Sequence, residues 1–205
     1  MTRYIDSRYV HIQKQVIQMY TAAIREKESI KVKVNIDELC YLFYLFVSGS
    51  ICGWIYEMIY CGITEGVIRN RGILYGPWLP IYGVGAVGIY FLKQWKNNPV
   101  KLFLMSALVA GIVEYVLGFI GIHFFGLRLW DYSGMFLNLN GIICFASVVC
   151  FACMGLLFHY LAEPFARKLY FKFSTEKTRK LGLVILVILA VDYLASALFR
   201  TPITY

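Results

Sequence analysis

Five apolar stretches, separated by short polar segments, dominate the pattern of the chain from residue 39 onward. They fall at about 39–62, 76–93, 101–123, 140–163 and 181–201. An α-helix needs roughly 20 consecutive apolar residues to cross the hydrocarbon core of a bilayer, and most of these stretches reach that length. The pattern therefore predicts an all-α protein, a polytopic membrane helix bundle with about five transmembrane helices.

The second stretch, 76–93, is short and is interrupted by helix-breaking residues. These are Pro77, Pro80, Gly83, Gly85 and Gly88. Such a helix is tolerated in a bilayer where neighbouring helices or a cavity satisfy the backbone groups that the break leaves unpaired. We therefore expect a broken helix here, or one that begins with a re-entrant turn.

Residues 1–38 are polar, but apolar residues recur among them at helical spacing. Ile12, Val16, Met19, Tyr20 and Ala23 predict an amphipathic helix from about residue 6 to residue 27. The segment lacks the three-part pattern of a signal peptide. It can cover the cytoplasmic end of the bundle, lie in the membrane interface or dock on a partner. We expect two parts, a cytoplasmic segment 1–38 and a membrane domain 39–205.

Composition agrees with a membrane protein. Of 205 residues, 60% are hydrophobic and 16% are charged, whereas soluble globular proteins have about 25% charged residues. The net charge of +8 raises the question of nucleic acid as a partner. The basic residues are segregated by side of the membrane, so anionic lipid accounts for them more simply.

The distribution of Lys and Arg predicts the orientation. With five spans, one side receives 1–38, 93–101 and 163–181, which carry seven, three and six of the twenty basic residues. The other side receives four: Arg69, Arg71, Arg128 and Arg200. Cytoplasmic loops carry the excess of Lys and Arg, so the prediction is N-terminus in and C-terminus out.

Three acidic residues lie within the apolar stretches: Glu57, Glu114 and Asp192. An ionisable group within a span is costly to insert, so each is expected to face the protein interior with a partner or water. Three carboxylates at that depth cannot all stay ionised without compensation. Two interpretations stay open: a site for a proton, a cation or a cationic group of a ligand, or a structural hydrogen-bond network between helices. We expect these acids, with arginines from the outer face, to form the functional centre.

Two loops on the predicted outer face hold the other candidates for binding a substrate or ion. Arg69 and Arg71 lie beside glycines and can bind a phosphate or carboxylate, or else pair with nearby acids and fix the loop. The second loop contributes Arg128, Trp130, Asp131 and Asn140. Aromatic residues also suit the membrane interface, and an asparagine at the start of a span can be a helix N-cap.

The six cysteines, at positions 40, 52, 61, 144, 150 and 153, all fall within the predicted spans. Cys150 and Cys153 have redox or metal spacing, but no histidine or second such pair accompanies them, so packing is the favoured interpretation. We expect no metal and no cofactor. No P-loop, G-x-S-x-G, H-E-x-x-H or dinucleotide fingerprint occurs, so the chain is not an ATPase by itself, and the balance favours a protein that is not an enzyme.

Several short motifs follow one another along the membrane part. They are Gly53-Trp54-x-x-Glu57, Arg71-Gly72-x-Leu74-x-Gly76-Pro77-x-x-Pro80-Ile81-Tyr82-Gly83, Glu114, Trp130-Asp131-Tyr132-Ser133 and Asn140-Gly141-x-x-Cys144. Over about residues 40–165, this combination resembles the bacterial family described as "putative ABC-transporter type IV", also labelled CmpB-like permeases. The resemblance implies a permease subunit of the bacterial plasma membrane that needs a separate ATP-binding subunit as partner.

Three functions fit these features. The first, which we favour, is a permease subunit or small transporter whose intramembrane acidic site opens to the outer face. The second is a membrane-embedded enzyme, or a lipid-binding protein, that acts on a phosphate-bearing lipid at the outer leaflet. The third is a non-catalytic assembly or sensor protein. The expected surroundings are the lipid bilayer, with an ATP-binding subunit or further copies of the chain as candidate partners and no nucleic acid.

Overall fold

The computed structural model describes residues 17–19, 36–64, 66, 70, 72–173 and 175–200. The chain forms two units, Met1–Glu38 and Leu39–Tyr205, and the account below concerns the second. The helix expected over residues 6–27 lies outside the described residues except for 17–19, which are helical.

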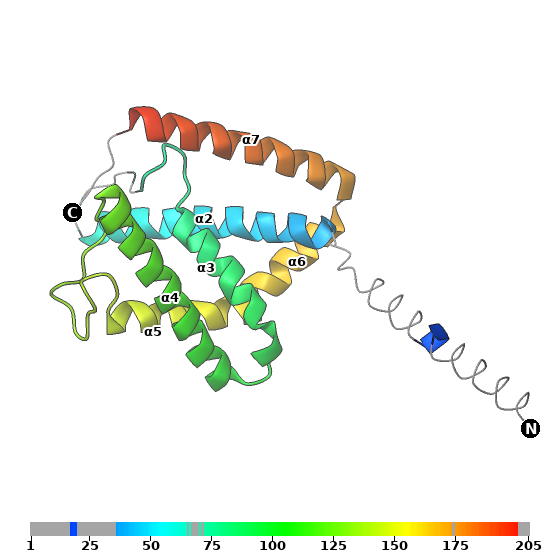
Figure 1. Ribbon diagram of the computed structural model, residues 1–205, viewed down its shortest axis with the longest axis horizontal. Helices are drawn as coiled ribbons and strands as arrows, with labels where there is room; N and C mark the ends of the chain where they lie inside the picture. The colour runs from blue at the N-terminus through cyan, green and yellow to red at the C-terminus, as the bar shows by residue number, and fades with distance from the viewer. Residues whose placement is uncertain are drawn as a thin grey trace, which may run out of the picture. The chain divides into compact units, whose positions relative to one another are not determined.

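The described residues form helices joined by loops and turns, and none of them is in a strand (Figure 1). In chain order the elements are α2 (Ile36–Thr64), α3 (Pro80–Tyr90), the 3-10 helix η1 (Phe91–Trp95), α4 (Pro99–Phe125), α5 (Phe145–Leu157), the π-helical turn η2 (Phe158–Ala162), α6 (Glu163–Lys172) and α7 (Thr175–Phe199). The prediction of an all-α bundle of membrane-spanning helices is confirmed.

Four helices of the described part are long and apolar enough to cross a bilayer: Ile36–Thr64, Pro99–Phe125, Phe145–Lys172 and Glu176–Phe199. The third is continuous through α5, η2 and α6. Pro164 has no N–H to donate to the preceding turn, and the wider π-helical turn lies directly before it. The end of α2 and the loop 126–144 lie at one end of the bundle, the loop end. Residues 93–101, the end of α6 and the start of α7 lie toward the other, the basic end (Figure 1).

The expected second span is a half-length helix, so the spanning helices number four rather than five in the described part. α3 has 11 residues and is about 16 Å long, against a hydrocarbon core of about 30 Å. Its start lies beside the middle of α2, because the Leu79 amide donates to the Ser50 carbonyl at 3.0 Å. Residues 72–79, which we call the re-entrant segment, reach this depth without helical structure. The break expected from the glycines and prolines is confirmed.

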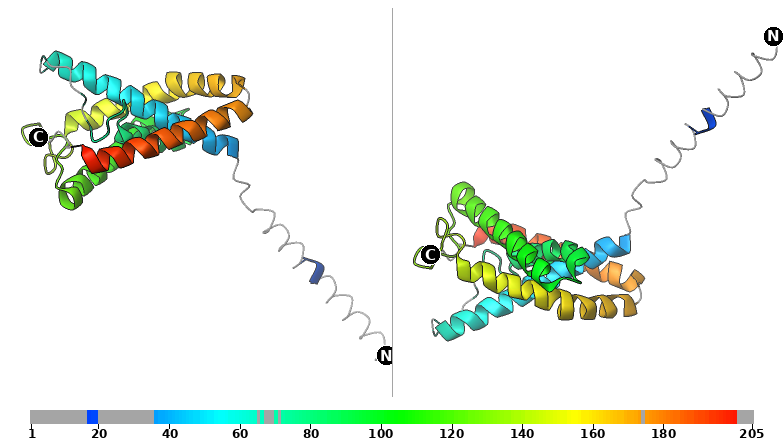
Figure 2. Two further views of the ribbon diagram at one scale, coloured as in Figure 1. Left: turned by 90° about the horizontal axis from the view of Figure 1, so that it is seen from above. Right: turned by 90° about the horizontal axis from the view of Figure 1, so that it is seen from below.

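Glycines let α3 lie directly against α2. A Cβ atom on Gly53 would overlap the ring of Tyr82, and one on Gly83 would lie 2.5 Å from the Phe46 carbonyl oxygen. Small residues of this kind allow helix backbones to approach closely inside a membrane, where packing rather than water drives association. Figure 2 shows the result, with α3 in the middle of the bundle among the longer helices.

An aromatic cluster joins α2, α3 and α6 at the basic end. The Tyr41 ring contacts the rings of Tyr90 and Tyr170, with centroids 6.0 and 5.4 Å apart. The Tyr41 hydroxyl donates to Glu163, and Arg167 donates to Glu163 at 3.0 Å and to the Tyr90 hydroxyl at 2.9 Å. The start of α2, the end of α3 and α6 are therefore held together by one mixed aromatic and ionic group.

Candidate functional site

A cavity of about 670 Å³ lies between α2, α3, α4 and the α5–α6 helix. Its lining on α2 runs from Leu45 to Glu57, a distance of about 18 Å along the helix axis. At the loop end it is lined by Glu57, Tyr82, Glu114, Trp130 and Tyr132. Toward the basic end the lining is apolar and includes Ile89, Leu161 and Phe165. The cavity is thus elongated, with its charged groups at one end.

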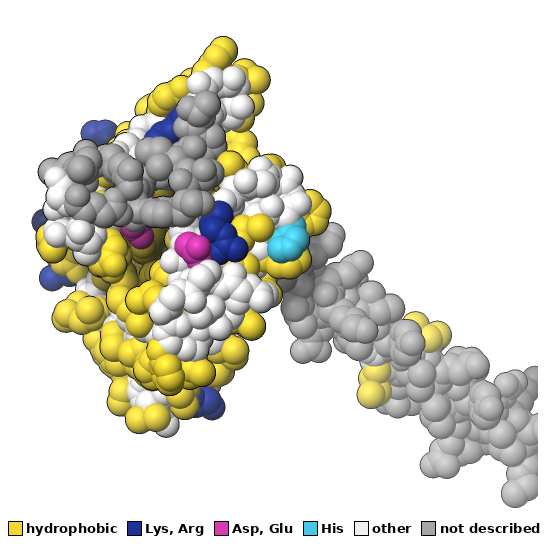
Figure 3. Space-filling view, turned by 90° about the vertical axis from the view of Figure 1, so that its left-hand side faces the viewer, with side chains coloured by type: hydrophobic (Ala, Val, Ile, Leu, Met, Phe, Trp, Pro, Cys, Tyr) yellow, Lys and Arg dark blue, Asp and Glu magenta, His cyan; other side chains and the backbone are white. Residues whose placement is uncertain are grey.

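Glu57 and Glu114 are the only Asp, Glu, Lys or Arg side chains among the described residues that line the cavity. Glu57 comes from α2 and Glu114 from α4, and the two helices bring these acids to one cavity. Figure 3 looks at the loop end, where the visible described side chains are mostly hydrophobic or uncharged and few are charged. The acidic character of the cavity therefore rests on these two residues.

Glu114 is buried, with 4% of its surface exposed. Its carboxylate accepts hydrogen bonds from the Tyr132 hydroxyl at 3.1 Å and the Ser147 hydroxyl at 3.0 Å. Burial and the neighbouring Glu114 carboxylate raise the pKa of the Tyr132 hydroxyl, so Tyr132 stays protonated and donates. Both of these partners are neutral. The hydrogen bonds satisfy the carboxylate oxygens but bring no positive charge to them.

Glu57 reaches the cavity one helical turn after Gly53. The Tyr82 ring occupies the space beside Gly53, and its hydroxyl donates to Glu57 at 2.6 Å. Residues four apart lie on one face of a helix, which explains why the glycine and the acid share the motif Gly-Trp-x-x-Glu. α3 is thereby joined to the acidic end of the cavity through Tyr82.

Asp192 lies elsewhere, two turns before the end of α7 and outside the cavity lining. Its carboxylate accepts from the backbone amides of Tyr75 and Gly76, at 3.1 and 3.0 Å, and from the Trp78 indole at 2.6 Å. The re-entrant segment has no helical hydrogen bonds of its own, so Asp192 satisfies groups that a bilayer would leave unpaired. The structure brings Glu57 and Glu114 together and gives Asp192 a different set of partners.

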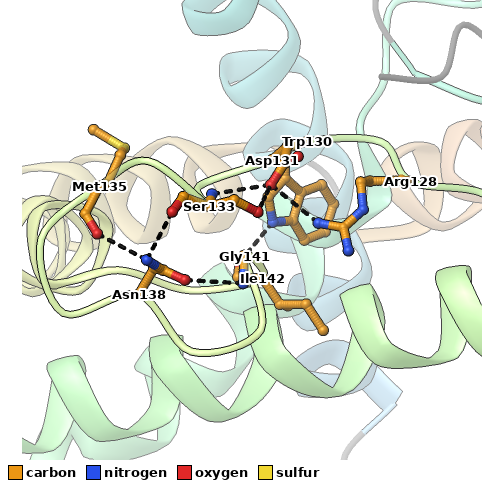
Figure 4. Close-up of polar contacts among 8 residues, drawn as sticks. All are labelled: Arg128, Trp130, Asp131, Ser133, Met135, Asn138, Gly141 and Ile142. Atoms are coloured by element: carbon orange, nitrogen blue, oxygen red, sulfur yellow. Dashed lines mark hydrogen bonds and ion pairs between the residues drawn. The ribbon is translucent and has the colours of Figure 1, made fainter.

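The loop between α4 and α5 is held mainly by contacts within itself (Figure 4). Arg128 pairs with Asp131 at 3.1 Å, and Asp131 also accepts from the Ser133 amide and hydroxyl. The hydrogen bonds from Ser133, with the charge of Arg128, lower the pKa of Asp131. The indole of Trp130 donates to the Ile142 carbonyl at 2.7 Å. Of the loop candidates, Trp130 lines the cavity, whereas Arg128 and Asp131 pair with each other outside its lining.

Asn140 does not cap the following helix, so that interpretation was wrong. Asn140 and Gly141 both have left-handed backbone angles, with φ of 56° and 67°, and these turn the chain before the helix starts. The N-cap is Cys144, whose sulfur accepts from the Ser147 amide at 3.4 Å. The side chain of Asn140 instead donates to the Tyr115 hydroxyl at 3.0 Å.

Arg69 and Arg71, predicted as anion-binding residues, lie outside the described residues. The six cysteines are free thiols, and Cys61 and Cys144 are buried. Within the described part of the chain, no group of three or more His, Cys, Asp or Glu side chains is placed to hold a metal ion.

The family comparison covers almost all of this architecture. The model of the family described as "Putative ABC-transporter type IV" matches residues 44–197. The chain belongs to this family. No curated protein and no solved structure matches the chain. The matched range runs from α2 to α7 and contains both acids of the cavity as well as Asp192. The family match and the four long apolar helices indicate a multi-pass membrane protein related to transport. The resemblance noted from the motifs is confirmed.

Sequence reasoning about this family member missed the neutral partners of the acids. Tyr82, Tyr132 and Ser147 donate to the two cavity glutamates, and Trp78 donates to Asp192. Tyr82 and Tyr132 do occur in the motifs, but tyrosines are common at membrane interfaces, so their types alone did not single them out. A usable signal was the serine at position 147, a polar residue inside an otherwise apolar stretch.

Proposed function

We propose that the chain is a permease subunit or small transporter of the bacterial plasma membrane, and that the cavity bounded by Glu57 and Glu114 is part of its transport path. The observation that carries the proposal is the buried Glu114 carboxylate, whose hydrogen-bond partners are neutral. It lies at one end of a mainly apolar cavity that extends about 18 Å along α2. Ionisable groups within membrane helices that face a cavity mark substrate or ion pathways in transport proteins.

The position of α3 supports a moving part. Tyr82 near its start bonds Glu57 at the acidic end of the cavity, and Tyr90 at its end bonds Arg167 in the basic-end cluster. α3 is short, so a small rigid shift of this helix changes both ends of the cavity together. Such coupling of two ends is what alternating access to a central site requires. In this proposal the cluster of Tyr41, Tyr90, Glu163 and Arg167 closes the basic end in the state described.

A separate ATP-binding subunit belongs to the proposal, because the chain has no nucleotide-binding motif of its own. The family description supports such a partner. Under the orientation predicted from the loop charges, the basic end faces the cytoplasm, where an ATPase would dock. The sharp turn between α6 and α7 and the η1 region are the described elements available there.

The test is purification of the tagged protein from its native host in a mild detergent, followed by mass spectrometry and an ATPase assay. Recovery of an ATP-binding cassette subunit near equal stoichiometry, with ATPase activity that changes in Glu114→Gln, is the expected result. Recovery of no such subunit, together with an unchanged profile of small molecules and lipids in a deletion strain, would overturn the proposal. Thr64→Ala, a change at an exposed position at the loop end of α2, is the control, because it lies away from both the cavity lining and the basic end.

A further inference from the structure

The shape of the cavity restricts what it can bind. The charged side chains of the lining are confined to the loop end. Apart from Ser48, whose hydroxyl donates to the Leu45 carbonyl, the remaining length is lined mainly by aliphatic and aromatic side chains such as Ile89, Leu157 and Phe165. A small polar solute would leave this length without suitable contacts. A molecule with one polar end and an extended apolar part matches the lining along its whole length.

The charge at the polar end restricts the head group. Glu114 is buried, and its hydrogen-bond partners are the neutral hydroxyls of Tyr132 and Ser147. No Lys or Arg occurs among the described lining residues. A carboxylate away from water is stabilised by a positive charge, and a phosphate or carboxylate head group would be repelled. This observation weighs against the phosphate-bearing lipid of the second hypothesis.

Aromatic rings complete the polar end. Tyr82, Tyr132 and Trp130 line the cavity together with the two acids. Aromatic faces attract cations, and a surrounding of several rings with carboxylates is the arrangement proteins use to bind ammonium and quaternary ammonium groups. Trp130 is held in place by the hydrogen bond from its indole to the Ile142 carbonyl, and Tyr82 and Tyr132 are fixed by their bonds to the acids.

We infer that the cavity binds a cationic amphiphile, with an ammonium head beside Glu114 and the aromatic rings and an apolar tail that extends toward the basic end. This inference rests on the proposed function, since it names the substrate class of the same transport path. The occupant is chosen by charge complementarity at one end and by apolar lining along the rest of the cavity.

The experiment measures binding of radiolabelled dodecyltrimethylammonium to the immobilised protein in dodecyl maltoside. Competitors with the same tail separate the head groups: dodecylamine is cationic, dodecanol is neutral and dodecyl phosphate is anionic. We expect saturable binding that dodecylamine displaces and that dodecanol and dodecyl phosphate displace weakly. Loss of one partner of a buried charge pair lowers affinity by roughly tenfold or more, which is the expected effect of Glu114→Gln. Glu176→Gln, an exposed acid on α7 outside the cavity, should bind as the parent does.

A second variant tests the tail independently of the acid. Gly85 lines the cavity, and a Cβ atom there would meet nothing within 4 Å. Gly85→Leu therefore fills part of the cavity without a backbone clash, and we expect it to weaken dodecyltrimethylammonium much more than hexyltrimethylammonium. This arm keeps the test decisive if Glu114→Gln does not fold.

The outcomes separate the inference from the proposed function. Equal competition by dodecyl phosphate, unchanged binding in Glu114→Gln, or no saturable binding of the probe would each overturn the cationic amphiphile. A permease with another substrate would still stand in these cases, provided the ATP-binding subunit is recovered. Specific binding of the probe without any ATP-binding subunit or transport phenotype would support the ligand class and overturn the permease.

Discussion

Asp192 and Glu114 are two acids inside apolar helices, and each binds a segment from the loop end of the bundle. Asp192 accepts from two backbone amides and an indole of the re-entrant segment. Glu114 accepts only from side-chain hydroxyls, and one of its donors, Ser147, has another acceptor in the Cys144 carbonyl at 3.0 Å. Asp192 lies outside the cavity lining, whereas Glu114 is part of it.

Under the proposed function, this difference separates a structural acid, Asp192, from an acid of the transport path, Glu114. Backbone amides have to be satisfied wherever an irregular segment lies in lipid, so an acid that satisfies them is needed by the fold. A side-chain hydroxyl does not require an acid as its acceptor in this way, and Ser147 also donates to the Cys144 carbonyl. A buried acid whose partners are hydroxyls lowers the stability of the fold. Where such an acid lines a cavity, we propose that it is kept for function.

The largest effect is expected from Asp192→Ala. The Tyr75 amide retains a bond to the Ser196 hydroxyl, but the Gly76 amide and the Trp78 indole lose their acceptor. An unsatisfied buried donor costs about 1–3 kcal/mol, so the loss of free energy of unfolding should be about 2–6 kcal/mol. Thermal melting in detergent, followed by size-exclusion chromatography, measures it. A melting temperature equal to that of the parent would refute the structural role of Asp192.

A smaller loss of stability is expected from Gly53→Ala, which disturbs the acidic end of the cavity and leaves the Asp192 contacts alone. The added methyl group would overlap the Tyr82 ring, and overpacking of this kind costs about 1–3 kcal/mol. Displacement of Tyr82 should also weaken the binding of the cationic probe. The same melting and binding measurements apply. Gly134→Ala is the control, because a Cβ atom there also meets nothing within 4 Å and the residue lies outside the cavity lining. Equal behaviour of the two variants would contradict the packing described.

Glu114→Gln should change stability by less than about 1 kcal/mol, because the amide keeps one acceptor and the apolar surroundings no longer hold a carboxylate. The contrast with Asp192→Ala is the sharpest test of the comparison: one variant should lose the fold and the other should lose ligand binding. If Glu114→Gln melts as low as Asp192→Ala, Glu114 belongs with the structural acids.

The smallest effect is expected from Arg128→Gln. Arg128 and Asp131 form an exposed pair, and such pairs contribute little because water screens them. Asp131 keeps its bonds from Ser133, so the loop should hold its shape. We expect no measurable change in melting temperature or in probe binding. A clear loss of binding would bring Arg128 back among the site residues.

The sequence was sufficient for the class of the fold and for the break in the second stretch. Hydropathy identifies spanning helices because lipid excludes unsatisfied polar groups, and the clustered Gly and Pro residues marked the start of α3. The fourth stretch, expected at about 140–163, corresponds to helical residues 145–172. The helix continues to Lys172 although Arg167 and Lys168 are polar, and the left-handed turn at Asn140 and Gly141 precedes its start.

The sequence identified the three acids but did not show which of them line a common cavity. Besides the nearby Ser196 hydroxyl, the donors to Asp192 come from the re-entrant segment and lie 114 to 117 positions away along the chain. Two of those donors are backbone amides, which every residue except proline has, so no residue type marks them. Glu57 and Glu114 likewise meet at one cavity only through the packing of α3 between α2 and α4. Depth in a span can be counted, but the direction in which a side chain faces depends on these contacts.

The long separation between Asp192 and its donors also sets an order on biosynthesis. The re-entrant segment leaves the ribosome more than a hundred residues before Asp192, which lies on α7, the last of the described helices to be made. Until α7 arrives, the amides near Gly76 have no carboxylate to receive them, and the nascent protein holds an incomplete bundle. A chain stopped before α7 should therefore be recognised by membrane quality control, and the arrival of α7 would be the step that satisfies the re-entrant segment.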